Sequence, residues 1–552
     1  MVENALYFGD NLDILRKYIK DESVDLIYLD PPFNSQANYN ILFKESSNAA
    51  GGGGEKSKAQ IEAFTDSWTW DSKAQATFEY LTGNNTVPSN VTELIIAIEQ
   101  FLGKNAMTAY VVMMTIRLLE MYRILKPTGS IYLHCDPTAS HYLKIVLDSI
   151  FDVRNFKNEI VWRRSFAHGD AKQGAKHFGR CTDSILFYTK TDSATWNPQY
   201  TPYSEEALKR DYKYIEEKTE RRYRLAPVDG PGGASKGNPF YEFLGVKGYW
   251  RFNQEKMQKL YEEGLIVRSS TGKSLSQKMY LDEAKGRPVD NLWDDIHRIS
   301  PNSSESLGYQ TQKPTALLER IISASSNKGD MVLDPFCGCG TAIDASEKLE
   351  RNWIGIDITH LAINLIKRRI KDKYPTAKFE VVGEPKDLEG AKQLAQSDRY
   401  QFEWWALSLI DARPINDKKK GSDRGIDGII YLFDPRDKTT KSVLVQVKSG
   451  HVKSGDIRDF KGTLEREKVK FGVFVTLEEP TKDMKEESIQ YGYEKSPLGD
   501  ESIAKIQILT IKEILDGIKP KVLFVNVSYK KAEHSKKKGR KKEIKKGKNK
   551  RL

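Results

Sequence analysis

One short apolar run that ends in an acid and two prolines constrains the fold of this chain more than any other stretch. Residues 24–29 (Val-Asp-Leu-Ile-Tyr-Leu) predict a short buried strand. Asp30, Pro31, Pro32 and Phe33 follow, and two prolines can neither continue a strand nor start a helix smoothly, so the chain must turn there. An acid, a proline carbonyl and an aromatic ring are therefore expected at the C-terminal end of a strand, where open α/β sheets hold ligands.

This arrangement suits the chemistry of an exocyclic amine. The amino group of adenine or cytosine is a poor nucleophile because its lone pair is delocalised into the ring. Asp30 and the carbonyl of Pro31 could accept its two N–H bonds and favour a pyramidal nitrogen, while Phe33 could stack on the extruded base. Asp-Pro-Pro is also common in turns that have no catalytic role, so the motif taken alone is equally consistent with a simple turn.

A second motif lies before this strand. Residues 7–12 (Tyr-Phe-Gly-Asp-Asn-Leu) predict a strand, a Gly-Asp turn and the start of an amphipathic helix. The helix returns to the strand that precedes Asp30, which makes a βαβ unit. Asp10 and Asp30 are therefore expected at the same edge of a sheet.

These motifs together resemble a known family. G-D-N-L-D-I-L followed by S-V-D-L-I-Y-L-D-P-P-F-N is similar to the amino-group DNA methyltransferases, which transfer a methyl group from S-adenosylmethionine to adenine N6 or cytosine N4. Residues 125–136 (L-K-P-T-G-S-I-Y-L-H-C-D) resemble the modification subunits of type III restriction systems. His134 and Asp136 end a predicted strand near the expected site, and a structural role is the interpretation we favour for both.

A nucleotide-binding βαβ unit is predicted much later in the chain. A strand at 331–334 leads into the glycine loop 335–340 and a helix, and a second strand ends at Asp357. A dinucleotide oxidoreductase usually has a third glycine here. S-adenosylmethionine has no pyrophosphate to hold, so the loop favours this cofactor over NAD.

With the upstream Q-K-P-T, the run V-L-D-P-F-C-G-C-G-T resembles the cofactor signature of the same family. The resemblance implies a cofactor-binding set that consists of Asp10, Lys313, Thr315, Asp334, Phe336, Gly338, Gly340 and Asp357. Asp334 would lie near the methionine amine, Asp357 on the ribose and Asp10 near the adenine end. Lys313 and Thr315 would line the methionine side.

The catalytic motif precedes the cofactor motif, which matches the permuted β arrangement of the family. The predicted fold class is α/β: a Rossmann-like methyltransferase sheet in permuted order, with an inserted recognition region and a C-terminal α/β nuclease-like domain. The predicted segments are the catalytic half 1–152, a target recognition region 153–305, the cofactor half 306–380, the nuclease-like domain 396–528 and a disordered basic tail 529–552.

The recognition region is suggested by composition as well as position. Strand–helix alternation fades there, and arginines and aromatic residues interleave at 162–164, 221–224 and 249–252. Such residues suit phosphate contacts, base-edge readout and base stacking, so double-stranded DNA is the expected partner. The motif D-P-P-F favours adenine N6. Cytosine N4, and a DNA-binding protein that keeps the fold without catalysis, stay open as alternatives.

The C-terminal segment is similar to the Mrr-like branch of restriction-endonuclease folds. The resemblance rests on F-E, G-I-D-G, V-Q-V-K and F-G-V-F-V-T between residues 400 and 478. Asp427 and Gln446 could bind Mg²⁺, with Glu403 and Lys448 in support. Gln446 departs from the commoner acidic residue and removes an anionic ligand. An active nuclease and a domain that only binds DNA or protein both remain open.

Charge and cysteine content limit the remaining classes. Residues 530–552 contain 13 Lys/Arg and 2 Asp/Glu, a net of +11 that accounts for the whole formal charge of +11. This tail suits solubility or nucleic-acid binding. The four cysteines form no zinc or disulfide pattern, and neither a membrane span nor a signal peptide is evident, which predicts a cytoplasmic protein. A restriction subunit or a second copy of the chain stays open as a partner.

Overall fold

The computed structural model contains two compact units. One consists of Met1–Thr195 and Leu292–Leu552, and the other of Trp196–Asn291. Each unit is described by itself. The residues whose structure is described are 4–32, 38–42, 60–65, 68–166, 176–300, 303–307, 309, 311–415, 425–434, 439–495, 502–521 and 525–526. Phe33 and the predicted basic tail lie outside them.

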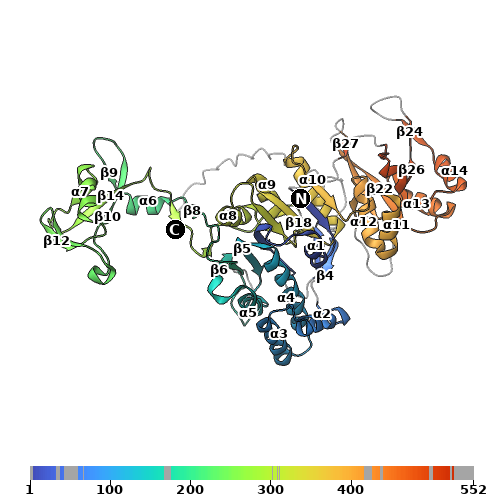
Figure 1. Cartoon of the computed structure of the whole chain (residues 1–552). Helices are drawn as coiled ribbons and strands as arrows, with labels where there is room; N and C mark the ends of the chain where they lie inside the picture. The colour runs from blue at the N-terminus through green and yellow to red at the C-terminus, as the bar shows by residue number, and fades with distance from the viewer. Residues whose placement is uncertain are drawn as a thin grey trace, which may run out of the picture. The chain divides into compact units, whose positions relative to one another are not determined.

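The first unit is built on a nine-stranded sheet (Figure 1). In spatial order its strands are β16 (Leu292–Trp293), β6 (Phe156–Arg163), β7 (Thr182–Thr189), β5 (Leu125–Cys135), β2 (Val24–Leu29), β17 (Met331–Asp334), β18 (Asn352–Asp357), β1 (Ala5–Phe8) and β19 (Glu380–Val382). Strand β2 runs parallel to β17, with Leu26 opposite Val332 and Ile27 opposite Leu333. The N-terminal half and the cofactor half therefore form one continuous sheet, which confirms the predicted permuted architecture.

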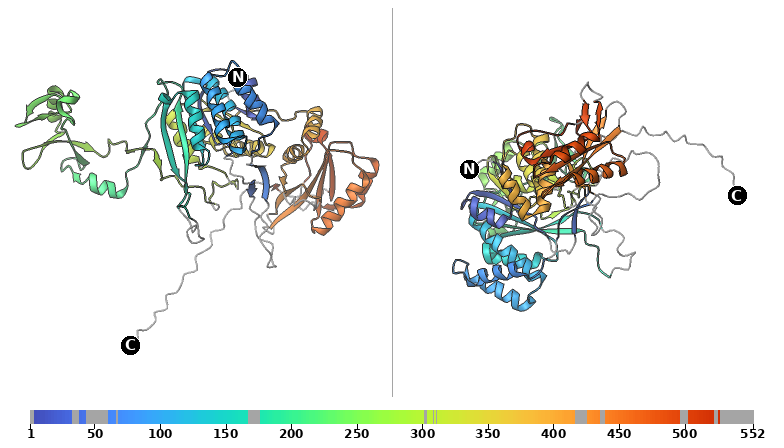
Figure 2. Two further views of the ribbon diagram at one scale, coloured as in Figure 1. Left: turned by 90° about the horizontal axis from the view of Figure 1, so that it is seen from below. Right: turned by 90° about the vertical axis from the view of Figure 1, so that its right-hand side faces the viewer.

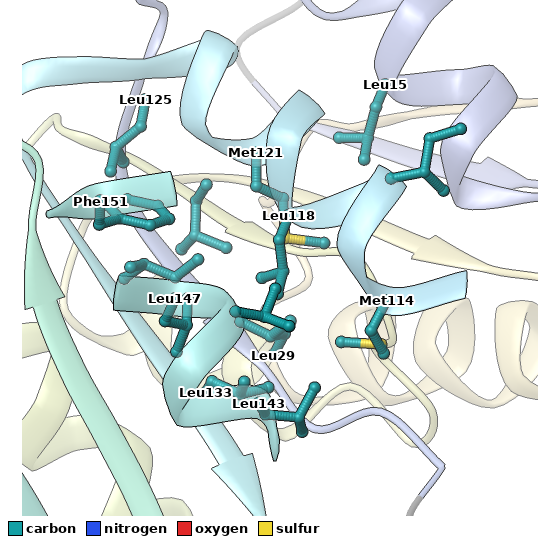
Figure 3. Packing of buried hydrophobic residues seen from close by; sticks show 14 of the residues in the cluster. Leu15, Leu29, Met114, Leu118, Met121, Leu125, Leu133, Leu143, Leu147 and Phe151 are labelled. Carbon is teal, nitrogen blue, oxygen red and sulfur yellow. The ribbon is translucent and has the colours of Figure 1, made fainter. Parts of the chain in front are cut away.

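Helices cover both faces of this sheet. On one face lie α1 (Asn11–Tyr18), α4 (Ala106–Ile124) and α5 (Ser140–Phe151), with α2 (Ser72–Gly83) and α3 (Ser89–Leu102) outside them. The other face carries α8 (Thr315–Ser325), α9 (Thr341–Lys348) and α10 (His360–Lys373). Leucine and methionine side chains from α4 interleave with Leu29 and Leu133 of the sheet, which fixes the strands below them (Figure 3). None of the helices in the described ranges is long and apolar enough to cross a bilayer.

The four strands at the centre of the sheet end at one edge. Strands β2, β17, β18 and β1 are mutually parallel neighbours in that order. Parallel strands bring their carboxyl ends to the same edge. The acids that follow or end these strands, Asp30, Asp334, Asp357 and Asp10, therefore share it. This confirms the expectation that Asp10 and Asp30 lie at one edge, although two strands separate theirs.

Part of the predicted recognition region belongs to the large sheet. Strand β7 pairs with β5 and with β6, antiparallel to both, and β16 returns beside β6 in parallel register. The remaining portion, residues 196–291, forms the separate compact unit. Its role in target recognition stays a prediction.

That second unit is small and rich in strands. It consists of β8 (Tyr200–Thr201), α6 (Glu205–Asp211), β9 (Tyr214–Ile215), β10 (Arg222–Pro227), β11 (Phe240–Phe243), β12 (Val246–Tyr249), α7 (Gln254–Glu262), β13 (Ile266–Arg268), β14 (Leu275–Tyr280) and β15 (Arg287–Pro288). Trp250 and Met257 are buried at its centre. It has an apolar core of its own, which is what an inserted module requires.

The C-terminal segment forms a six-stranded sheet of its own (Figure 2). Its strands are β20 (Arg413–Pro414), β21 (Gly428–Asp434), β22 (Thr439–Lys448), β23 (Phe471–Thr476) and β26 (Ile506–Thr510), with β27 (Val525–Asn526) beside β21. Helices α11 (Leu388–Ser397) and α12 (Arg399–Leu409) pack on one face, and α13 (Ser454–Arg466) and α14 (Lys482–Gln490) on the other. The predicted hairpin that joins Asp427 to the strand of Gln446 is present as β21–β22.

Candidate active site

Asp30 lies at the end of β2 on the face that α8 covers. Side chains alternate along a strand, and Ile27 and Leu29 pack into the core beneath α4. Tyr28 and Asp30 therefore project toward the opposite face. Pro31 is buried directly after Asp30 and stiffens the turn. The predicted base-stacking residue, Phe33, lies outside the described residues.

Lys313 forms an ion pair with Asp30. Its Nζ donates a hydrogen bond to Asp30 Oδ2, and the two side chains are 10% and 16% exposed. Asp30 Oδ1 is buried and has no hydrogen-bond partner among the described residues. One carboxylate oxygen is thus held by a cation while the other is available as an acceptor. The sequence placed Lys313 on the methionine side of the cofactor and did not predict this contact, which joins residues 283 positions apart.

The cofactor loop between β17 and α9 approaches its neighbours closely. Gly338 and Gly340 have φ of +49° and +74°, a region that side chains disfavour. A Cβ on Gly340 would lie 2.6 Å from Cγ1 of Ile366, so only glycine fits there without a shift. The predicted glycine loop is therefore needed for the path of the backbone itself.

Two acids lie beside this loop, Asp334 fully buried and Asp357 partly buried. Asp334 Oδ1 accepts the N–H of Phe336 at 3.1 Å, and burial raises the pKa of Asp334 well above its ordinary value. Asp357 accepts from the amide of Gly338 at 2.9 Å and from the amide and hydroxyl of Thr359 at 2.9 and 2.8 Å. Burial raises the pKa of Asp357 to about 6, and these hydrogen bonds limit the rise.

Asp10 has structural partners at the same edge. It caps α1 by accepting the N–H of Leu12 at 2.8 Å. It also pairs with Arg117, whose Nη2 lies 2.8 and 3.0 Å from its two carboxylate oxygens. Asn11 bridges Arg117 to the cofactor loop, because it accepts from Arg117 Nε and donates to the carbonyl of Pro335 at 2.8 Å. Neither Arg117 nor Asn11 was predicted as a site residue. Asn11 lies within the Gly-Asp-Asn-Leu motif, whereas no motif surrounds Arg117.

A buried acid on α9 braces the cofactor loop from behind. Asp344 is 1% exposed and pairs with Arg369 at 2.6 Å and with Lys373 at 2.7 Å. Burial alone would raise the pKa of Asp344, but these two cations lower it below its ordinary value. Arg369 Nη1 also donates to the carbonyl of Cys339 at 3.1 Å, so the ion pair holds the loop in place. Sequence reasoning missed Asp344 and Arg369 as well.

Thr315, predicted on the methionine side, begins α8. Its backbone N–H and its hydroxyl both donate to Glu305 Oε1 at 2.6 Å. Glu305 was not predicted, since no motif surrounds it. The pair fixes the helix start that follows Lys313.

The edge as a whole fits S-adenosylmethionine. That cofactor carries an ammonium group, a sulfonium and ribose hydroxyls, which are partners for carboxylates. The edge supplies the buried Asp334, the partly buried Asp357 and a glycine loop in which a Cβ would collide. It also supplies Oδ1 of Asp30, which has no partner among the described residues. Cys337 and Cys339 in the loop are buried free thiols. Among the described residues, no cluster of three His, Cys, Asp or Glu could hold a metal ion.

The residues expected to bind Mg²⁺ in the C-terminal sheet fit that ion poorly. Asp427 precedes β21, and its Oδ2 accepts the N–H of Val447 at 2.8 Å. Gln446 is 8% exposed and its Oε1 has no partner in the described part of the chain, but a neutral amide supplies no charge. Lys448 follows two residues later in β22 and shares the face of Gln446. Glu403 lies on α12, which packs against the opposite face.

Two family models match the chain. The first, an N6/N4 methyltransferase model described as a DNA methylase, covers residues 24–368. The second, described as a NACHT-associated inactive restriction endonuclease, covers residues 400–516. Their boundary agrees with the passage from the nine-stranded sheet to the six-stranded sheet.

Several curated proteins are similar over much of the chain. The type II methyltransferase M.EcaI of Enterobacter cloacae is 28% identical over 408 residues, which are 73% of this chain and 77% of that protein. The Mod subunit of the type III restriction-modification enzyme StyLTI of Salmonella typhimurium is 27% identical over 62% of this chain, but the match spans only 49% of the subunit. The DNA adenine methyltransferase YhdJ of Escherichia coli is 25% identical over 66% of this chain and 82% of that protein.

Proposed function

The chain belongs to the DNA methylase family, and we propose that it transfers a methyl group from S-adenosylmethionine to the N6 amine of adenine in double-stranded DNA. The observation that carries this proposal is the pair at the end of β2. Lys313 holds one oxygen of Asp30 while the other, buried Oδ1, has no partner among the described residues. A buried acceptor without a donor is costly unless a ligand completes it.

Asp30 activates the amine by accepting a hydrogen bond from one of its two N–H groups. As an N–H bond is drawn toward Oδ1, the nitrogen lone pair leaves conjugation with the ring and becomes available for attack. The carbonyl of Pro31 is the proposed second acceptor. Lys313 offsets the carboxylate charge at this partly buried edge and fixes its orientation. The proposal that Phe33 stacks on the extruded base rests on the resemblance of the motif to the family.

The cofactor residues divide the ligand between them. When bound, S-adenosylmethionine supplies an electrophilic methyl group on its sulfonium. Asp334 is proposed to hold the methionine amine and Asp357 the ribose hydroxyls. Gly338 and Gly340 let the backbone approach, with Phe336, Lys313 and Thr315 on the methionine side. Asp10, which already holds Arg117, is proposed to support the adenine end chiefly by fixing α1.

Adenine is favoured over cytosine by the residue before the prolines. The motif begins with Asp30, whereas many enzymes that act on cytosine N4 have serine there. The similarity to an adenine methyltransferase of Escherichia coli supports the same choice. The relatives from restriction-modification systems support a role in such a system, acting in the cytoplasm, with unit 196–291 reading the target. A restriction subunit is the partner this context implies.

The C-terminal domain is proposed not to cleave DNA. Its described residues offer Mg²⁺ one carboxylate with an oxygen already committed to Val447, next to the neutral Gln446. The matching family model is itself described as inactive. A role in binding DNA or protein is the remaining proposal for this domain.

The proposed function is tested by nucleoside analysis of duplex DNA incubated with tritiated S-adenosylmethionine. We expect the label in N6-methyladenine. Asp334→Asn should weaken cofactor binding in a direct titration, since the carboxylate charge is lost. Label in N4-methylcytosine would overturn the choice of base. A wild-type chain that binds the cofactor but labels no DNA would overturn the activity.

A further inference from the structure

We propose that Tyr28, His134 and Asp183 form a buried chain of hydrogen bonds that positions Asp30 for reaction. The inference rests on the proposed function, because it assigns a task to residues behind the proposed catalytic acid. None of the three belongs to the proposed cofactor-binding set. They connect strand β2 to β5 and β7 directly behind the reacting edge.

The chain is continuous and hidden from solvent. Tyr28 Oη lies 3.0 Å from His134 Nδ1, and His134 Nε2 lies 3.3 Å from Asp183 Oδ2. Arg164 Nε approaches the other oxygen of Asp183 at 3.5 Å. His134 is 0% exposed, and Tyr28 and Asp183 are also buried. Four side chains from three strands and the residue after β6 thus form one polar connection through an otherwise apolar layer.

The charges around Asp183 fix the direction of its hydrogen bond with His134. Burial alone would raise the pKa of Asp183, but the hydrogen bond with His134 and the charges of His134 and Arg164 lower it. An ionised carboxylate only accepts, so His134 Nε2 must donate to it. His134 Nδ1 and the hydroxyl of Tyr28 share the second hydrogen bond of the chain, at 3.0 Å. Burial raises the pKa of Tyr28 well above its ordinary value, so the phenol keeps its proton.

The position of Tyr28 connects this chain to the reaction. Tyr28 and Asp30 are two residues apart in an extended segment and project to the same face. The negative charge of Asp30 is the next cause, after burial, of the raised pKa of Tyr28, which reflects their proximity. Tyr28 is anchored to His134 on β5 and, through it, to Asp183 on β7. This anchor fixes the position of the backbone of β2 that carries Asp30. An apolar side chain at 28 would fill the space without that anchor.

A buried polar chain of this kind needs a reason. Placing Asp183 and His134 in the interior costs free energy that a well-packed apolar layer would avoid. Their bonds are specific in direction and length, so they fix one arrangement where apolar packing tolerates several. Misplacing a catalytic group by about 1 Å costs on the order of a hundredfold in rate. The end of β2 is where such precision would matter.

The same face offers a matched control. Tyr132 lies on β5, is as buried as Tyr28, and its hydroxyl is 2.6 Å from Ser325 Oγ on α8. Tyr28→Phe and Tyr132→Phe each remove one buried hydroxyl and its hydrogen bond. Only the first breaks the chain behind Asp30. A purely structural role predicts that the two variants behave alike.

The test compares both variants with wild type in methyl transfer, in cofactor binding and in thermal unfolding. We expect similar losses in Tm and unchanged Kd for S-adenosylmethionine. The kcat of Tyr28→Phe should fall by about tenfold or more, while that of Tyr132→Phe stays within about twofold of wild type. The KM for DNA should not change in either.

A second pair of variants asks whether the hydrogen bond itself acts. Asp183→Asn keeps an acceptor for His134, so its kcat should remain well above that of Asp183→Ala. Equal kcat in the two tyrosine variants, or in the two Asp183 variants, would overturn the inference while wild-type activity upheld the proposed function. An inactive wild-type chain would overturn the proposed function and the inference with it.

Discussion

Two sheets of the larger unit each place an aspartate at a strand end, and their surroundings differ. At the methyltransferase edge, Asp30 has a buried lysine on one oxygen and no described partner on the other. In the C-terminal sheet, Asp427 gives one oxygen to the amide of Val447, and the neighbouring polar side chain is the neutral Gln446. At the methyltransferase edge, a lysine holds one carboxylate oxygen and leaves the other available to a ligand. In the C-terminal sheet, the carboxylate stabilises its own hairpin.

Residue type and strand position therefore do not by themselves make a site. Both aspartates lie within recognisable motifs, Asp30 directly after β2 and Asp427 directly before β21. What separates them is the set of groups around them, namely Lys313 and two further acids in one sheet and an amide in the other. Replacing residues in each set should therefore have unequal consequences.

The largest effect is expected from Asp30→Asn, compared with Asp427→Asn. Loss of the Asp30 carboxylate removes the acceptor that activates the amine, and kcat should fall by about a thousandfold or more. Asp427→Asn should leave methyl transfer within about twofold of wild type. Steady-state kinetics with a DNA substrate measures both. Full activity in Asp30→Asn would refute the assigned role.

The brace behind the cofactor loop should matter for stability. Arg369→Met leaves the fully buried Asp344 with Lys373 as its one ion-pair partner in the described part of the chain, beside a hydrogen bond from the hydroxyl of Tyr374. We expect a loss of about 3 kcal/mol in unfolding free energy. Lys373→Met removes a partner that is 48% exposed and should cost less than about 1 kcal/mol. Urea unfolding of the two variants gives the comparison. If both variants lose the same unfolding free energy, the burial of Arg369 does not determine how much its ion pair with Asp344 stabilises the fold.

Cofactor affinity should depend on pH through Asp357. Its pKa is about 6, so the carboxylate is ionised at pH 8 and mostly protonated at pH 5.5. The ionised form is the one that accepts hydroxyl hydrogens, so the affinity for S-adenosylmethionine should be about fourfold weaker at pH 5.5 than at pH 8. Calorimetric titration at both values measures this. Asp357→Asn serves as control and should lose the part of the pH dependence that Asp357 contributes, while Asp334, whose pKa burial also raises, contributes a part of its own.

The smallest effect is expected in the C-terminal sheet. Supercoiled DNA incubated with the wild-type chain and Mg²⁺ should not be nicked above background, and Lys448→Ala should change nothing. A gel assay over several hours is sufficient. Nicking that disappears in Lys448→Ala would instead make Asp427, Gln446 and Lys448 a working nuclease site.

Much of this fold could be predicted from patterns of residues that are close in sequence. The apolar run before Asp30 matches β2 residue for residue, and the glycine loop and the strand that ends at Asp357 lie where the motifs place them. These elements depend on residues close in sequence. The permuted sheet was predicted as well, because both halves carry a motif.

The contacts that complete the site could not be predicted in this way. Lys313 meets Asp30, and Arg117 meets Asp10 across 107 positions, because separate strands and helices converge at one edge. Strands β6 and β7 join the large sheet although basic and aromatic residues obscure their alternation. His134 was interpreted as structural, and only its two partners in neighbouring strands suggest more.

The central claim is that Asp30 directs methylation of adenine N6. Long-read sequencing of host DNA detects modified bases together with their sequence context, in cells that carry the wild-type gene or the Asp30→Asn variant. We expect N6-methyladenine at one defined target in cells with the wild-type gene and none in cells with the variant. N4-methylcytosine at that target, or equal adenine methylation in both strains, would contradict the claim.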